Sequence, residues 1–64
     1  MCLSTVYKVD GGNREMFARN IQNVINDSER GELRFRDIMG IEYALRGRIL
    51  SIDLVANNIE VAEN

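Results

Sequence analysis

Residues Ile41–Val55 read IEYALRGRILSIDLV, and this stretch decides the fold because apolar residues alternate along it. They occupy odd positions from 41 to 45 and even positions from 50 to 54. Alternation is typical of a β-strand with one buried face, and a phase shift of one residue beside Gly47 indicates a bulge or a sharp bend. We therefore predict one long extended stretch that bends near Gly47, as strands do where they pass between the two sheets of a small barrel.

Shorter runs of the same kind lie on either side of this stretch, and Gly, Asn and Asp separate them. The pattern predicts strands at Leu3–Val9, Glu32–Ile38 and Ile59–Val61, with turns at Asp10–Asn13, Ser28–Gly31 and Ala56–Asn58.

The segment Arg14–Asp27 is ambiguous. Its apolar residues fall near helical spacing and Asn13 is a suitable N-cap, which favours a helix slightly. Two short strands, Glu15–Ala18 and Gln22–Asn26, fit the same residues with a break between them. The local pattern alone leaves both readings open.

Five or six short strands with turn signals every 8 to 12 residues predict an all-β fold, a small and mostly antiparallel barrel of SH3-like or Sm-like type. We expect residues 1–64 to form a single domain, because the chain has no repeat or linker. A chain this short buries only about 60% of its unfolded surface, so a metal or a partner subunit is a common source of extra stability. Self-association is therefore expected.

Composition excludes several classes of function. The chain has no His and one Cys, which rules out the common nucleophile–histidine enzymes and the usual zinc sets, so we expect no enzyme. The net charge of −2 gives no general attraction to nucleic acid or to anionic membranes. There is neither an apolar run near the length of a membrane span nor a signal-peptide pattern, and we expect a cytoplasmic protein.

The strongest candidate for chemistry is Cys2, which directly follows Met1. A small residue at this position normally lets the cell remove the initiator methionine, so that Cys2 becomes the N-terminus. Its amine and thiolate can then chelate one metal ion, and the backbone amide nitrogen of Leu3 can close a second ring. Planar nitrogen and sulfur donors suit Ni(II) or Cu(II). If Met1 stays, its amine with the Cys2 amide and thiolate offers a similar set. The alternative is that Cys2 is a small apolar residue with an inert thiol.

A second candidate is a nucleic-acid surface built from arginines at alternate positions, namely Arg34, Arg36, Arg46 and Arg48. Acidic residues interleave them, however, and a solvated sheet face with cross-strand ion pairs explains the spacing better. Met16 and Met39 carry soft sulfurs that suit copper, but we expect them to pack in the core.

Three stretches of the chain resemble the CooT-like family. They are Met1-Cys2-x-Ser4-x-Val6-Tyr7, Asp37-Ile38-x-Gly40, and Arg48-Ile49-x-x-Ile52-Asp53-Leu54 followed by Ile59 and Val61. The resemblance implies an Sm-like barrel that forms a homodimer and binds Ni(II) through the N-terminal Cys. It also implies an accessory role in the maturation of carbon monoxide dehydrogenase. In this family the segment corresponding to Arg14–Asp27 is extended, so the resemblance favours strands there.

From the family's metal residues only Cys2 carries over, and the adjoining amide here belongs to Leu3. Residues Asn20–Asn23 stand where relatives have a more acidic stretch. We expect Cu(II) and Zn(II) to compete with Ni(II) in vitro. The remaining functional alternatives are an Sm-like RNA-binding protein that uses the arginine-bearing face and a protein-interaction module without metal.

Overall fold

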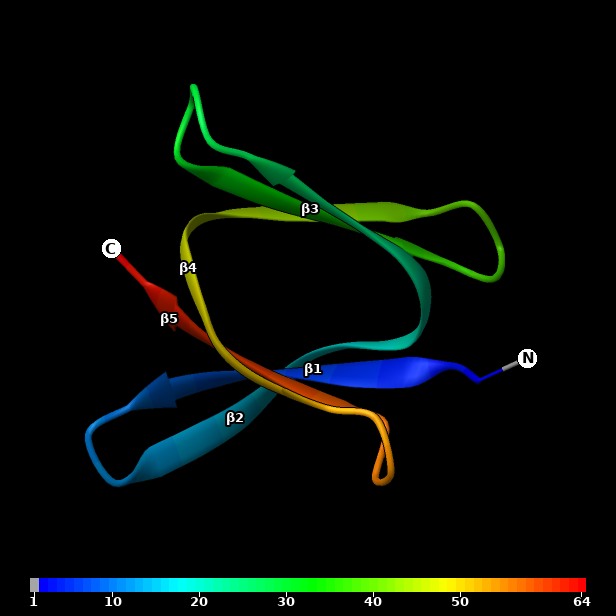
Figure 1. The fold of residues 1–64 in the computed structure, drawn as a ribbon, viewed down its shortest axis with the longest axis horizontal. Helices are drawn as coiled ribbons and strands as arrows, with labels where there is room; N and C mark the ends of the chain where they lie inside the picture. The colour runs from blue at the N-terminus through cyan, green and yellow to red at the C-terminus, as the bar shows by residue number, and fades with distance from the viewer. Residues whose placement is uncertain (1) are drawn as a thin grey trace.

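A computed structural model describes residues 2–64 of the chain, and Met1 lies outside the described residues. The described residues form five β-strands and contain no helix. The strands are β1 (Ser4–Asp10), β2 (Asn13–Asp27), β3 (Glu32–Asp37), β4 (Glu42–Asp53) and β5 (Asn58–Glu63). Each strand pairs with the next, and β1 pairs in parallel with β5 to close a barrel (Figure 1). The predicted all-β barrel is therefore confirmed.

No helix in residues 2–64 is long and apolar enough to cross a membrane.

The ambiguous segment is a single strand, so the local preference for a helix over Arg14–Asp27 is wrong. The first half of β2 pairs with β1, and its second half pairs with β3. Between these halves Asn20 has a left-handed backbone with φ of 58°, and the register with β3 shifts between Ile21 and Asn23. Pairing with two different neighbours outweighs the weak helical spacing, and the bend falls where the predicted break lay.

The predicted bend in β4 is confirmed at Gly47. Residues 42–46 pair with β3, and residues 47–53 pair with β5, so the strand exchanges one pairing partner for the other at this glycine. A Cβ atom at Gly47 would lie 2.0 Å from the Ala62 carbonyl oxygen. Glycine is therefore required by a close approach of two backbones.

The predicted phase shift lies in a different place. The odd-numbered phase continues through Gly47 to Ile49, which packs against the core, and the register shifts only between Ile49 and Ser51. Leu50 is the extra residue of this bulge and is exposed. The alternation predicted that Leu50 points into the core, and this prediction is wrong. The chain bends at Gly47 without an extra residue, so the phase of the strand does not change there.

The core contains eight buried apolar residues contributed by all five strands: Val6, Ala18, Ile21, Leu33, Phe35, Leu45, Ile59 and Val61. Phe35 is fully buried, and the Phe17 ring meets it edge-on with 6.1 Å between the ring centroids. Full burial of one such side chain contributes about 1.5–3 kcal/mol to folding. Met16 and Met39 are exposed instead, so their predicted core positions are wrong.

Candidate functional site

Cys2 and Leu3 lie at one end of the barrel, immediately before β1 (Figure 1). Cys2 is exposed and its thiol is free, whereas Leu3 is partly buried. The pairing of β1 with β2 begins at Ser4, and its pairing with β5 begins at Thr5. The two residues that carry the predicted metal donors therefore precede the paired part of the strand.

Two turns flank this chain end, one on each side of β1. On the β2 side, Ser4 pairs with Ile21, and the neighbouring Asn20 carbonyl accepts a 2.9 Å hydrogen bond from the Ile38 amide of the β3–β4 turn. On the β5 side, the Thr5 amide donates a 2.9 Å hydrogen bond to Asn57 of the β4–β5 turn. In Figure 1 the first residues of β1 accordingly lie between these two turns.

The side chains around Cys2 do not complete a metal site within one chain. Among residues 2–64 there is no group of three or more His, Cys, Asp or Glu side chains placed to hold an ion. The candidate donors at this end are the Cys2 thiolate and the main-chain nitrogens beside it. The alternative that uses the Met1 amine lies outside the described residues.

A buried carboxylate organises the β3–β4 turn. Asp37 is only 7% exposed, and one of its oxygens accepts hydrogen bonds from the amides of Met39 at 2.9 Å and Ile41 at 3.0 Å. Its other oxygen accepts a 3.4 Å hydrogen bond from the Tyr43 hydroxyl. Gly40 has a φ of 85°, which only glycine adopts without cost. The Asp37-Ile38-x-Gly40 motif thus fixes the path of this turn.

The β4–β5 turn is built in a similar way. The Asp53 side chain accepts hydrogen bonds from the amides of Val55 at 3.0 Å and Ala56 at 2.9 Å. Asn57 then takes a left-handed backbone with φ of 58°, a conformation that Asn tolerates better than most residues. Both turns beside the N-terminus are therefore held by an aspartate that caps backbone amides.

These capped turns present apolar side chains to solvent. We call the set formed by Ile38, Met39, Ile41, Ile52, Leu54 and Val55 the apolar end; their exposed fractions are 52, 80, 52, 52, 80 and 95%. This surface was not predicted from the sequence. The sequence did contain a signal for this surface. Large apolar residues lie in and beside turns that also contain Gly or Asn, where polar residues are the rule.

The four arginines of the nucleic-acid hypothesis do not form one patch. Arg34, Arg36 and Arg46 lie where β3 pairs with β4, whereas Arg48 follows the bend in β4 and pairs with Ala62 of β5. Arg34 contacts Glu32 at 3.2 Å and Asp27 at 3.6 Å, and Arg36 contacts Glu42 at 3.8 Å. The expected arrangement of a solvated face with ion pairs is present for Arg34 and Arg36, whereas Arg46 and Arg48 have no ion pair among residues 2–64.

RNA binding is therefore expected to be absent. Purified protein should give no retention of a labelled single-stranded RNA in a filter assay at low salt, and Arg34→Ala with Arg36→Ala should leave this background unchanged. A matched control removes the same charge from Arg46 and Arg48. Binding that falls steeply with salt and disappears only in the Arg34/Arg36 variant would contradict this prediction.

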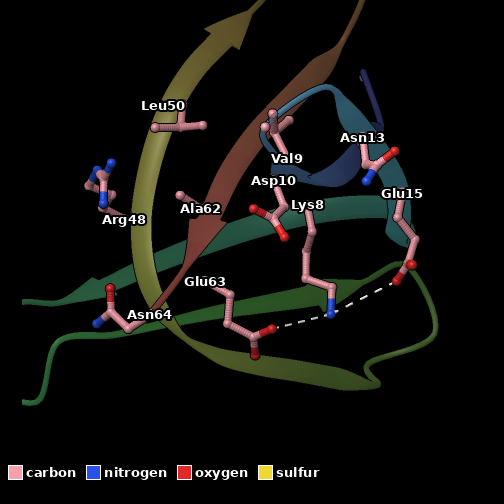
Figure 2. Close-up of a pocket in the computed structure, with 11 residues that line it drawn as sticks. Lys8, Val9, Asp10, Asn13, Glu15, Arg48, Leu50, Ala62, Glu63 and Asn64 are labelled. Carbon is pink, nitrogen blue, oxygen red and sulfur yellow. Dashed lines mark hydrogen bonds and ion pairs between the residues drawn. The ribbon is translucent and has the colours of Figure 1, made fainter.

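The other end of the barrel contains an open groove of about 660 Å³. Figure 2 shows the Lys8 amine within it, between Glu63 at 3.4 Å and Glu15 at 3.9 Å. Asp10 and Arg48 also line the groove, so its charges are mixed. This groove lies at the end that holds the β1–β2 turn, away from Cys2 (Figure 1).

A family model and solved structures match this chain. The family model described as CO dehydrogenase accessory protein CooT matches residues 1–62. The crystal structure assigned to a CooT from Carboxydothermus hydrogenoformans is 24% identical, covers 98% of each chain and superposes with a TM-score of 0.87. This structural likeness concerns the fold. No curated protein matches the sequence.

Proposed function

The chain belongs to the CooT family of CO dehydrogenase accessory proteins, and we propose that it carries Ni(II) on its N-terminal Cys2 for delivery to such an enzyme. The ion is cargo that is taken up and passed on, and the barrel performs no catalysis. The exposed position of the Cys2 thiol at the start of β1, in a member of this family, is the observation that carries the proposal.

The donors available at this end fit nickel. Removal of Met1 frees the Cys2 amine, which together with the thiolate and the Leu3 amide nitrogen gives three donors in one plane. Leu3 precedes the first paired residues of β1, so binding through its nitrogen need not break the pairing with β2 or β5. Ni(II) and Cu(II) prefer planar sites of this composition.

A second copy of the chain supplies the fourth donor in this proposal. One chain offers three planar donors, and no described cluster of side chains provides another. A homodimer that brings two N-termini together places a second thiolate beside the ion. Such a site at the molecular surface is readily loaded and readily emptied, which suits delivery to a client in the cytoplasm. Cu(II) and Zn(II) compete for it in vitro, since intrinsic affinity does not favour nickel over copper.

A nickel titration of Cys2→Ser tests the proposal. The protein should be untagged, with mass spectrometry confirming that Met1 is absent. Wild type should bind Ni(II) at mildly alkaline pH with a thiolate-to-nickel charge-transfer absorption, and Cys2→Ser should lose this absorption and at least about 100-fold in affinity. Because Cys2 is exposed, its replacement should leave the thermal unfolding midpoint unchanged.

A matched control keeps the thiol but blocks the amine. Wild type with two extra residues before Cys2 should bind nickel more weakly and without the same planar spectrum. Equal nickel uptake by wild type and Cys2→Ser would overturn the proposal.

A protein-interaction module without metal is the second candidate, and the apolar end favours it. This function predicts that binding of a partner is indifferent to Cys2→Ser. The nickel titration therefore separates the two candidates.

A further inference from the structure

The groove at the end of the barrel away from Cys2 lies where the closing pair of strands comes apart. The register of β1 with β5 ends at Lys8 and Val61, although β1 continues to Asp10 and β5 to Glu63. In Figure 1 the ends of these two strands diverge accordingly. Backbone groups beyond the last pair therefore lack a partner from the opposite strand. They border the groove of about 660 Å³, a volume within the range of about 300–1,000 Å³ that is usual for ligand pockets.

Two opposite charges in this groove have no partner. Among residues 2–64, neither the Asp10 carboxylate nor the Arg48 guanidinium forms an ion pair or a side-chain hydrogen bond. The other three charged residues of the groove form one cluster, in which the Lys8 amine lies 3.4 Å from Glu63 and 3.9 Å from Glu15. The groove thus offers one free negative group and one free positive group.

These two free charges lie on opposite sides of β5. Arg48 of β4 pairs with Ala62 of β5, and Ala62 directly follows the last residue of β5 that pairs with β1. Figure 2 shows the small Ala62 side chain between those of Arg48 and Asp10. Neighbouring strands lie about 4.8 Å apart, so two strand spacings separate β4 from β1 by about 10 Å. A ligand that binds both charges must therefore span about 10 Å.

We propose that this groove binds a short zwitterionic peptide of about three residues, with its carboxylate on Arg48 and its amine on Asp10. Three extended residues span about 10 Å, which matches the separation of the two charges. The amide groups of the peptide meet the unpaired backbone at the ends of β1 and β5, as in other peptide sites at open strand edges. Val9 and Leu50 also line the groove and supply apolar contacts to its side chains.

Other classes of ligand fit the groove less well. Three carboxylates against two cations line it, so a purely anionic ligand such as a nucleic acid is disfavoured. Among residues 2–64 no group of three or more His, Cys, Asp or Glu side chains is placed to hold a metal ion. A peptide with both termini free uses the guanidinium, the carboxylate and the open strand ends together. The inference is independent of the nickel function proposed for Cys2.

A titration of the ¹⁵N-labelled full chain with trialanine, followed by NMR, tests the proposal. The amide signals of Val9, Gly11, Glu63 and Asn64 should shift in a saturable way, with a dissociation constant of about 1 mM or below. N-acetyl-trialanine lacks the free amine, and trialanine amide lacks the carboxylate. Each of these two peptides should bind at least about fivefold more weakly, because each loses one charge-assisted hydrogen bond.

Variants of the two free charges locate the site. Arg48→Ala and Asp10→Asn should each weaken trialanine binding at least about fivefold. Arg46→Ala is the matched control, because Arg46 is also exposed and without an ion pair among residues 2–64 but does not line the groove. This control should bind trialanine as wild type does. Far-UV circular dichroism should show that all three variants are folded.

Three outcomes overturn the proposal. The first is the absence of a saturable shift up to about 20 mM trialanine. The second is equal binding of trialanine and its two blocked forms, which would show that the charged termini are not recognised. The third is an equal effect of Arg48→Ala and Arg46→Ala, which would assign the shifts to general attraction by surface charge.

Discussion

A Gly47→Ala variant is expected to lose most of the free energy that keeps the barrel folded. The added Cβ would lie 2.0 Å from the carbonyl oxygen of Ala62 and 3.0 Å from a methyl carbon of Leu45. The closest atom belongs to the backbone of β5, and Gly47 itself pairs with Glu63, so relief requires the two strands to separate. Overpacking of this kind costs about 3 kcal/mol or more, and a core of this size rarely supplies more than about 3–5 kcal/mol.

Urea unfolding followed by far-UV circular dichroism measures the loss. Gly12→Ala is the matched control, because a Cβ at Gly12 has nothing within 4 Å and the residue lacks a left-handed φ. This control should change the free energy of unfolding by less than about 0.5 kcal/mol. Equal losses in the two variants would show that the close approach at Gly47 does not limit stability.

The same glycine shows what sequence reasoning captured about β4. The pattern around Gly47 predicted a bend between two sheets, and the bend is there because a glycine allows the backbones to touch. The sequence pattern did not distinguish a bend in the strand from a β-bulge. The bulge lies between Ile49 and Ser51. The apolar residues at positions 49, 50 and 52 fit an inward face of odd-numbered or of even-numbered residues. Only the register of β4 with β5 decides between these two phases.

β2 shows the limit of local spacing. Its apolar residues fit a helix and a bent strand almost equally, because Ala18 and Ile21 are the only buried positions in the strand. The choice is made by β1 and β3, which supply backbone partners to the two halves. The resemblance to the CooT-like family, in which this segment is extended, predicted the strand correctly. The spacing of the apolar residues alone did not.

The candidate site was predicted only in part. Cys2 stands out in the sequence because it is the only cysteine and follows Met1, and its role in metal binding stays a prediction. The apolar end could not be assembled from sequence, since its members come from two turns that are distant along the chain. Met39 was expected in the core because methionine usually is, and it is exposed instead.

Replacement of Asp37 by Ala is expected to be the second severe substitution, at about 2–3 kcal/mol. The carboxylate is buried and accepts hydrogen bonds from Met39, Ile41 and Tyr43. Hydrogen bonds to a charged group contribute about 1.5–3 kcal/mol, and the orphaned amides would add a desolvation penalty. Asp37→Asn should lose less, because its amide oxygen can still accept from both backbone amides.

Asp53→Ala is the matched control for this effect, since Asp53 also accepts from two turn amides but is exposed. Water can replace the lost acceptor there, so the loss should stay near about 1 kcal/mol or below. Amide hydrogen exchange supplies a local readout: exchange at Met39 and Ile41 should accelerate in Asp37→Ala and not in Asp53→Ala. If exchange at these amides is unchanged, Asp37 does not hold the turn.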